Sequence, residues 1–125
     1  MLQDILMTVK ETLQKSAILN EYQIDQLIKN VKWWKNGDRI YPGTIMSKIN
    51  SDVNTTYDIL DIIKQIGILE VNYEIYCSKC DRFKGIVYRA LNQIPKDLTC
   101  DCNHIIEPFN DTIVIYRVVN DGTSK

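Results

Sequence analysis

The sequence has 125 residues, enough for one domain or for two small domains that share a core. Its 45% hydrophobic and 25% charged residues are typical of a soluble globular chain, and its formal net charge of −1 lacks the basic surplus of a protein that binds mainly through phosphate contacts. Gln3 and Asp4 stand where a signal peptide has a basic start and an apolar core, and no apolar run approaches the ~20 residues of a membrane span. We therefore expect a cytoplasmic protein with no membrane partner. The abundance of Ile, Asn and Lys is typical of an AT-rich bacterial or phage genome.

Two amphipathic helices are predicted in the first third of the chain. Apolar residues at three- and four-residue spacing predict the first helix over residues 2–14. Asn20 is a good N-cap for the second helix, and Gln23 three residues later completes a capping-box pattern. Gly37 occupies the position of a left-handed C-cap, which predicts that the second helix ends at about Asn36.

A short strand and a short helix are predicted next. Residues 39–41 have the composition of a strand, and Pro42-Gly43 then turns the chain. The short helix that follows directs Ile45 and Ile49 toward the core.

A longer helix is predicted after a turn over residues 50–53. Asn54 or Thr55 is its expected N-cap, and Gly67 is its expected end. A strand begins at Leu69. Two helices joined by a short turn in this way form a helix-turn-helix unit.

The apolar positions of this segment resemble the core of a winged-helix domain. These positions are Ile45, Ile49, Val53, Thr56, Leu60, Ile63, Gly67 and Leu69. The resemblance is at superfamily level and covers roughly residues 2–76. It implies that the longer helix is a recognition helix and that transcription regulation is the default function to test.

The second half of the chain changes to a period of two, which predicts strands. Leu69, Val71, Tyr73 and Ile75 alternate along the first strand, and residues 83–90 and 112–119 are the second and third. We therefore expect an α+β fold with three parts: a helical, winged-helix domain (1–72), a zinc-ribbon-like module (73–119) and a flexible tail (120–125).

Four cysteines are predicted to bind one structural zinc ion. The ligands are Cys77, Cys80, Cys100 and Cys102. Two close pairs separated by 19 residues suit a tetrahedral ion, and clustered cysteines in a reduced compartment are better explained as metal ligands than as disulfides. The arrangement resembles a zinc ribbon, although its second pair is C-x-C, and Asp81 and Asn103 stand where a ribbon usually has glycine.

Other interpretations of the cysteines stay open. His104, the single histidine, lies two residues after Cys102 and is an alternative fourth ligand; otherwise it is a surface loop residue, and the chain could also bind no metal. A thioredoxin-like use of Cys77 and Cys80 needs a strand-to-helix junction, whereas this pair lies between two predicted strands. A four-thiolate site has no open coordination position, which excludes a catalytic zinc.

The predicted recognition helix has the composition of a protein interface rather than of a DNA reader. Asp58, Asp61 and Lys64 sum to −1, and a carboxylate near a phosphate is repelled. Several isoleucines lie off the buried stripe, and the first helix, the zinc module or a partner chain could cover them. The candidate interface residues are Tyr57, Asp58, Ile59, Asp61, Ile62, Lys64 and Ile66.

A basic segment points the other way, toward nucleic acid. Its candidate residues are Lys29, Lys32, Trp33, Lys35, Arg39 and Lys48. The five cations, with Asp38 as the one carboxylate, give +4 between residues 29 and 48. A solvated basic helix face with a partly packed tryptophan explains the same pattern.

The sequence thus predicts a non-catalytic, zinc-binding adaptor or accessory subunit that holds a protein partner in a larger bacterial complex, one that handles nucleic acid or acts in defence. The alternative is a sequence-specific DNA-binding regulator. An enzyme ranks last, because the chain has one histidine and five scattered glycines, with no nucleophile–base pair or phosphate loop. We expect no small-molecule substrate.

Overall fold

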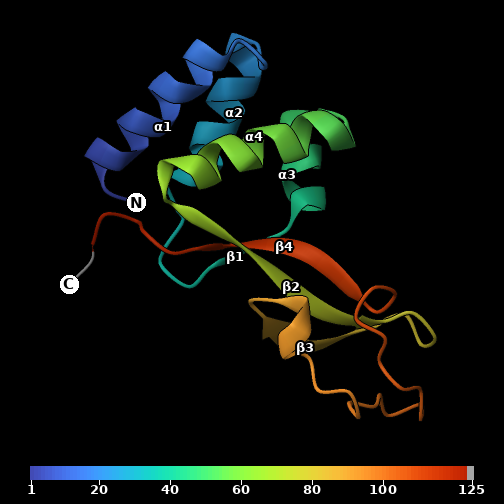
Figure 1. Cartoon of the computed structure of the whole chain (residues 1–125). Helices are drawn as coiled ribbons and strands as arrows, with labels where there is room; N and C mark the ends of the chain where they lie inside the picture. Colours follow the sequence, from blue (N-terminus) through green and yellow to red (C-terminus); the bar gives the residue numbers. More distant parts are fainter. Residues whose placement is uncertain (124–125) are drawn as a thin grey trace. The chain divides into compact units, whose positions relative to one another are not determined.

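The computed structural model describes residues 1–123 and has a mixed α+β architecture (Figure 1). The helices are α1 (Gln3–Ser16), α2 (Glu21–Val31), α3 (Pro42–Ile49) and α4 (Val53–Ile66), and the strands are β1 (Arg39–Ile40), β2 (Leu69–Cys77), β3 (Arg82–Tyr88) and β4 (Thr112–Val118). The strands form an antiparallel sheet in the order β1-β4-β2-β3. The predicted α+β class is confirmed.

The chain divides into two compact units. Unit 1 comprises Met1–Glu70 and the segment from Tyr116 onward, and unit 2 comprises Val71–Ile115. The sequence division placed residues 116–119 in the second part. They belong to unit 1 because the last residues of β4 pair with β1, with Arg117 opposite Arg39 and Tyr116 opposite Ile40.

Unit 1 is built on four helices that pack side by side. Helix α1 packs on α2 and α4, α2 packs on α3, and α3 packs on α4. Each helix contributes an apolar stripe to one core, as its periodicity predicts. Fully buried side chains of this core include Val9, Leu13, Leu27, Val31, Ile49, Ile59, Leu60, Ile63 and Tyr116.

Helix α2 begins where the sequence predicts but ends five residues early. The Asn20 side chain accepts from the Gln23 N–H, and Gln23 accepts from the Asn20 N–H, so the capping box is confirmed. The predicted end at Asn36 is wrong, since the helix stops at Val31. The chain turns there and buries Trp34, and Gly37, with φ of 94°, donates its N–H to Val118 at the entry to β1. The left-handed glycine therefore serves a turn and not a helix cap.

Helix α4 begins two residues earlier than expected. Asp52, not Asn54 or Thr55, is the N-cap, and its carboxylate accepts from the Thr55 N–H at 2.7 Å. This hydrogen bond lowers the pKa of Asp52. The predicted end is confirmed, because Gly67 adopts the left-handed C-cap with φ of 98°.

Asp121 holds the end of the described chain on unit 1. Its carboxylate accepts from the Asn36 N–H, its own N–H donates to the Asn36 side chain, and its carbonyl accepts from the Leu2 N–H. The residue is 5% exposed. The predicted flexible tail also includes residues 124 and 125, which lie outside the described residues.

Asp121 should make the stability of unit 1 dependent on acid pH. Hydrogen bonds from the Thr123 hydroxyl and N–H and from Asn36 lower the pKa of Asp121 to about 2. A depressed carboxyl pKa contributes stability that is present above the unfolded value of about 3.9 and is lost as the pH falls toward 2. We expect the fluorescence of buried Trp34 to show unit 1 weakening over this window. In Asp121→Asn the stability of unit 1 should depend less steeply on pH over this window. An unchanged slope would contradict Asp121 as the cause of the dependence.

Unit 2 is a hairpin of β2 and β3 with a long, irregular return segment. Its buried core consists of Ile75, Cys77, Ile94, Cys100 and Ile106. The hairpin register pairs Tyr73 with Tyr88 and Cys77 with Arg82, and it shifts between Glu74 and Tyr76.

The simple alternation predicted for β2 is wrong. Asn72 and Glu74 are buried, whereas Val71 and Tyr73 are half-buried. A register shift of this kind turns a strand locally, so that consecutive residues Glu74 and Ile75 are both buried.

Candidate metal centre and surface sites

Unit 2 brings the four cysteine sulfurs together at one end of its hairpin. Cys77 ends β2, Cys80 lies in the turn before β3, and the other two cysteines lie in the loop closed by the Thr99–Ile105 bridge. All four Sγ atoms lie within 4.8 Å of one another, with 3.7 Å from Cys77 to Cys102 and 3.3 Å from Cys80 to Cys100.

These distances fit a single tetrahedral metal ion. Four metal–sulfur bonds of about 2.3 Å place the sulfurs about 3.8 Å apart. All four thiols are free, and the shortest separations are far above the ~2.05 Å of a disulfide. Four cysteines arranged in this way can hold a metal ion, and thiolate sulfur favours a soft or borderline one.

Both cysteine pairs are followed by a residue with left-handed backbone. Asp81 has φ of 52° and Asn103 has φ of 67°, a backbone conformation in which glycine is the usual residue. Asn103 donates its N–H to the Cys100 carbonyl at 2.9 Å, and Cys100 donates to the His104 carbonyl at 2.9 Å. The backbone is therefore folded into tight turns that direct each pair of thiols to the same side.

The surroundings affect the thiols unequally, and the hydrogen bond with Cys100 raises the pKa of the Cys80 thiol to about 12. The Cys102 N–H donates to Cys100 and lowers the pKa of the Cys100 thiol to about 6. Arg82 and Lys84 line the surface depression beside Cys80 and Cys100, and Lys84 forms an ion pair with Asp101 at 3.3 Å. A divalent ion with four thiolates carries a charge of about −2, and Arg82 and Lys84 offset part of it, because Asp101 already pairs with Lys84.

Asp111 joins the two cysteine turns, and sequence reasoning missed it. Its fully buried carboxylate accepts from the Ser78 N–H at 2.9 Å and from the Ser78 hydroxyl, within the first turn. It also accepts from the Glu107 N–H and from His104 Nε2, each at 2.8 Å, just beyond the second turn. Burial alone would raise the pKa of Asp111, but these hydrogen bonds hold it well below its usual range.

His104 lies outside the group formed by the four sulfurs. It groups instead with Glu107 and Asp111. Because Asp111 is ionised and can only accept, His104 Nε2 carries a hydrogen and donates a hydrogen bond to that carboxylate. His104 lies in a loop, as one interpretation predicted, but its side chain is only 16% exposed and hydrogen-bonds to the buried Asp111 carboxylate.

Helix α4 presents only part of its predicted interface. Ile59 is fully buried in the core of unit 1, which removes it from any surface. Asp61 accepts from the Tyr116 hydroxyl at 2.8 Å and so also supports the fold. Of the other predicted residues, Tyr57, Ile62 and Ile66 are half-buried, and Asp58 and Lys64 are exposed.

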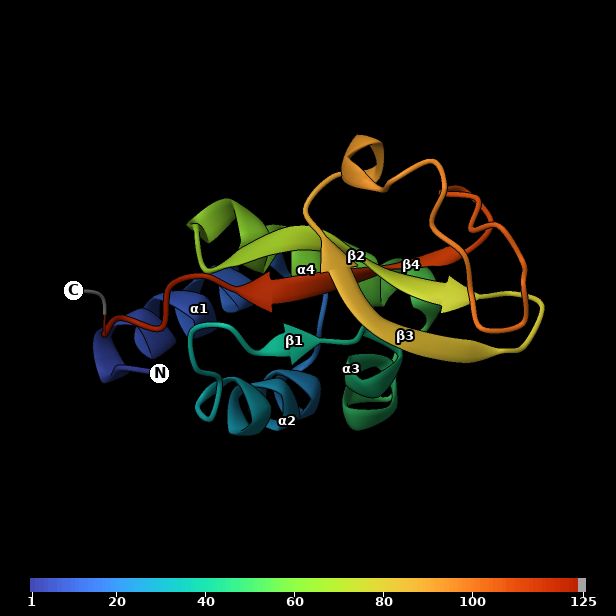
Figure 2. The ribbon, with the colours of Figure 1, turned by 90° about the horizontal axis from the view of Figure 1, so that it is seen from below.

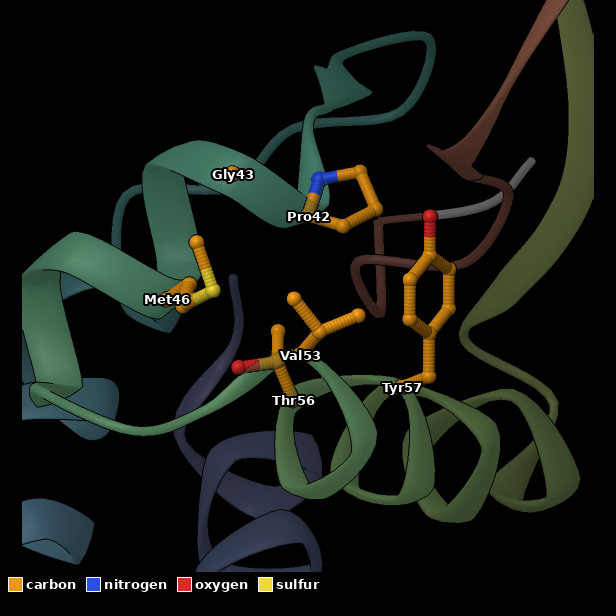
Figure 3. Close-up of a pocket in the computed structure, with 6 residues that line it drawn as sticks. All are labelled: Pro42, Gly43, Met46, Val53, Thr56 and Tyr57. Atoms are coloured by element: carbon orange, nitrogen blue, oxygen red, sulfur yellow. The ribbon is translucent and has the colours of Figure 1, made fainter.

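An apolar pocket lies between α3 and α4. It has a volume of about 220 Å³ and is lined by Pro42, Gly43, Met46, Val53, Thr56 and Tyr57. Figure 3 shows the Val53, Met46 and Tyr57 side chains around its opening. Val53 is 55% exposed although it is β-branched and apolar. The predicted core position of Val53 is therefore wrong, and its side chain lies at the rim of a pocket that helix periodicity does not reveal.

The predicted basic residues all lie on the surface of unit 1. Lys29, Lys32, Lys35, Arg39 and Lys48 are exposed. Trp33 is 71% exposed, and the Lys32 ammonium lies over its ring at 5.4 Å from the centroid. Arg117, which sequence analysis did not include, is exposed opposite Arg39.

Comparisons of the chain with protein-family models, with curated proteins and with solved structures gave no match. In the part of the chain that the structure describes, no helix combines the length and the apolar composition needed to cross a membrane. A function for this protein therefore rests on its own side chains and their geometry.

Proposed function

We propose that the protein is a non-catalytic adaptor in which a structural zinc ion holds unit 2 and the α3–α4 surface of unit 1 binds a protein partner. The four sulfurs within 4.8 Å of one another support the choice of zinc, because a borderline-soft ion without geometric preference suits four thiolates. The left-handed residues after each cysteine pair support a zinc-ribbon-like turn.

The apolar pocket between α3 and α4 is the observation that carries the adaptor function. An exposed apolar side chain at its rim, Val53, leaves surface in water that a partner's side chain would cover. A volume of about 220 Å³ suits one leucine-sized or aromatic side chain as an anchor, which is how small interfaces concentrate their affinity.

The charge around this pocket supports a basic partner. Asp52 caps α4 next to Val53, and Asp58 follows Tyr57, so the exposed side of α4 carries more carboxylates than its one cation, Lys64. A partner segment with lysine or arginine beside an apolar anchor complements this surface. The same carboxylates disfavour a DNA phosphate backbone.

A sequence-specific DNA-binding regulator is the second candidate. Helix α3 ends at the left-handed Asn50, and a short turn then leads into α4. Two helices in this order support a winged helix in which α4 is the recognition helix. On this alternative, Asn54 and Thr55 at the start of α4 would face base edges.

Replacing Val53 by aspartate should abolish partner binding and leave the fold intact. The residue is the first of α4, where a carboxylate is favourable to the helix, but the new charge would enter the apolar pocket. The measurement is capture from the native lysate on tagged protein, after nuclease treatment. We expect tagged wild type to retain one protein in stoichiometric amount. The amount retained on tagged Val53→Asp should be at least roughly 10-fold lower.

The matched control is Ile18→Asp, which places the same charge on another exposed apolar residue of unit 1. It should retain the partner. Equal loss on both variants, or equal retention, would contradict the pocket as the docking site. Recovery of DNA with proteins that disappear after nuclease treatment would replace the adaptor by the regulator.

A further inference from the structure

We propose that unit 1 also binds single-stranded nucleic acid, on a surface formed by the end of α2, the loop after it and the β1–β4 pair. We call this the Trp33 surface, and it consists of Lys32, Trp33, Lys35, Arg39 and Arg117. It does not involve the α3–α4 pocket, so the proposal goes beyond protein docking and does not depend on it.

Trp33 supplies the platform on which a base would stack. It is 71% exposed, whereas its neighbour Trp34 is 6% exposed, so the fold uses one indole for the core and leaves the other in water. The Lys32 ammonium lies over the ring, which restricts the ring's position and places a positive charge at the platform. An accessible ring next to a cation is the arrangement that stacks a base and binds the adjoining phosphate.

Arg39 and Arg117 supply the phosphate contacts. They are direct partners in the antiparallel register of β1 and β4. Their neighbours Ile40 and Tyr116 are buried, so both arginines face the open side of this strand pair, which Figure 2 shows with α4 behind it. Two guanidinium groups at opposed positions of one strand pair can contact successive phosphates of an extended strand.

The charge balance around the loop is consistent with an anionic ligand. Lys29, Lys32 and Lys35 precede Arg39, and the one carboxylate between residues 29 and 39, Asp38, accepts the Lys35 backbone N–H. Because these contacts are to phosphate, we expect an affinity that falls steeply with salt.

The exposed tryptophan favours a single strand over other polyanions. A base within a duplex is already stacked, whereas an unpaired base is free to stack on an indole. The carboxylates on α4 also disfavour its insertion into a duplex groove. An anionic membrane surface would bind the lysines but would not require base stacking.

Fluorescence anisotropy tests the proposal with full-length, metal-loaded protein and fluorescein-labelled oligo(dT), oligo(rU) and a duplex. We expect one or both single strands to bind more tightly than the duplex, and Trp33→Ala to weaken that binding about 10-fold. Arg39→Gln and Arg117→Gln should each reduce the slope of log K against log salt concentration by about 0.7. The two single-stranded probes distinguish DNA from RNA.

Lys15→Gln, which removes an exposed cation at the end of α1, is the matched control and should change neither the affinity nor the slope. Binding should also quench tryptophan emission in wild type but not in Trp33→Ala, where buried Trp34 remains and reports an intact unit 1. The proposal fails if no single strand binds at near-physiological salt, or if Trp33→Ala binds like wild type. It also fails if vesicles containing phosphatidylserine bind more tightly than either oligonucleotide.

Discussion

Replacing Cys100 by serine is expected to abolish binding of the proposed zinc ion and to unfold unit 2, while unit 1 keeps its helices. Cys77 and Cys100 belong to the small buried core of unit 2, which contains three isoleucines besides. A segment of this size buries too little apolar surface to fold alone. Structural zinc contributes roughly 10–16 kcal/mol in comparable small modules, so a metal-free unit 2 should be unfolded.

Two measurements on purified Cys100→Ser separate the units. The zinc content should fall from one ion per chain in wild type to almost none in the variant. Amide NMR signals of Val71–Ile115 should collapse to unfolded positions, while Trp34 fluorescence and helical circular dichroism persist. A variant that kept its zinc and its melting temperature would overturn the four-cysteine centre.

His104→Gln is the discriminating companion variant. His104 does not group with the sulfurs, so this variant should still bind one zinc per chain. If it lost the metal while Cys102→Ser retained it, the site would consist of three cysteines and His104. The two variants therefore decide between the ligand sets that the sequence left open.

Helix periodicity and local capping residues predict most of the helices and their ends. They fail where a contact with a residue distant in the sequence determines where a helix ends. The capping box at Asn20 and the left-handed end at Gly67 use residues within three or four positions of each other, so sequence alone identifies both. The end of α2 depends instead on burial of Trp34 and on a bond from Gly37 to β4, a strand far along the chain.

The start of α4 illustrates a different limit. Residues 51–56 contain five side chains able to cap a helix, and composition does not choose among them. Asp52 is selected because its carboxylate reaches the Thr55 N–H while its carbonyl accepts from the Thr56 hydroxyl. Thr56 in turn is 1% exposed and belongs to the core, so packing fixes the register.

The candidate sites divide in the same way. Cysteine spacing alone predicts the four-sulfur group, because each pair is local and thiol chemistry is specific. Strand alternation could place Arg117 on the open face, but its position beside Arg39 depends on the strand order β1-β4. Asp111 carries no sequence signal: a single aspartate before a strand is ordinary until the chain folds it against both cysteine turns.

Replacing Asp111 by asparagine should make zinc dissociate about 10–100-fold faster and destabilise unit 2 by about 3 kcal/mol. The carboxylate uses one oxygen for Ser78 and the other for Glu107 and His104. An amide keeps one oxygen, and its NH₂ group must face donors on the other side. One cysteine turn therefore loses its link to the other, although every sulfur ligand remains. Zinc transfer to a chromogenic chelator measures the rate, and thermal unfolding measures the stability.

Asp101→Asn is the matched control for this effect. Asp101 is also next to the cysteines and is also an aspartate, but its side chain is 97% exposed and its ion pair with Lys84 lies at the surface. An exposed pair of this kind contributes about 0–1 kcal/mol, so zinc release should stay close to wild type. If both variants released zinc equally fast, the effect would be one of charge near the metal. If Asp111→Asn released zinc as slowly as wild type, the sulfurs alone would hold the two turns together. We expect fast release in Asp111→Asn alone, because Asp111, unlike Asp101, bonds to Ser78 in the first turn and to His104 and Glu107 just beyond the second.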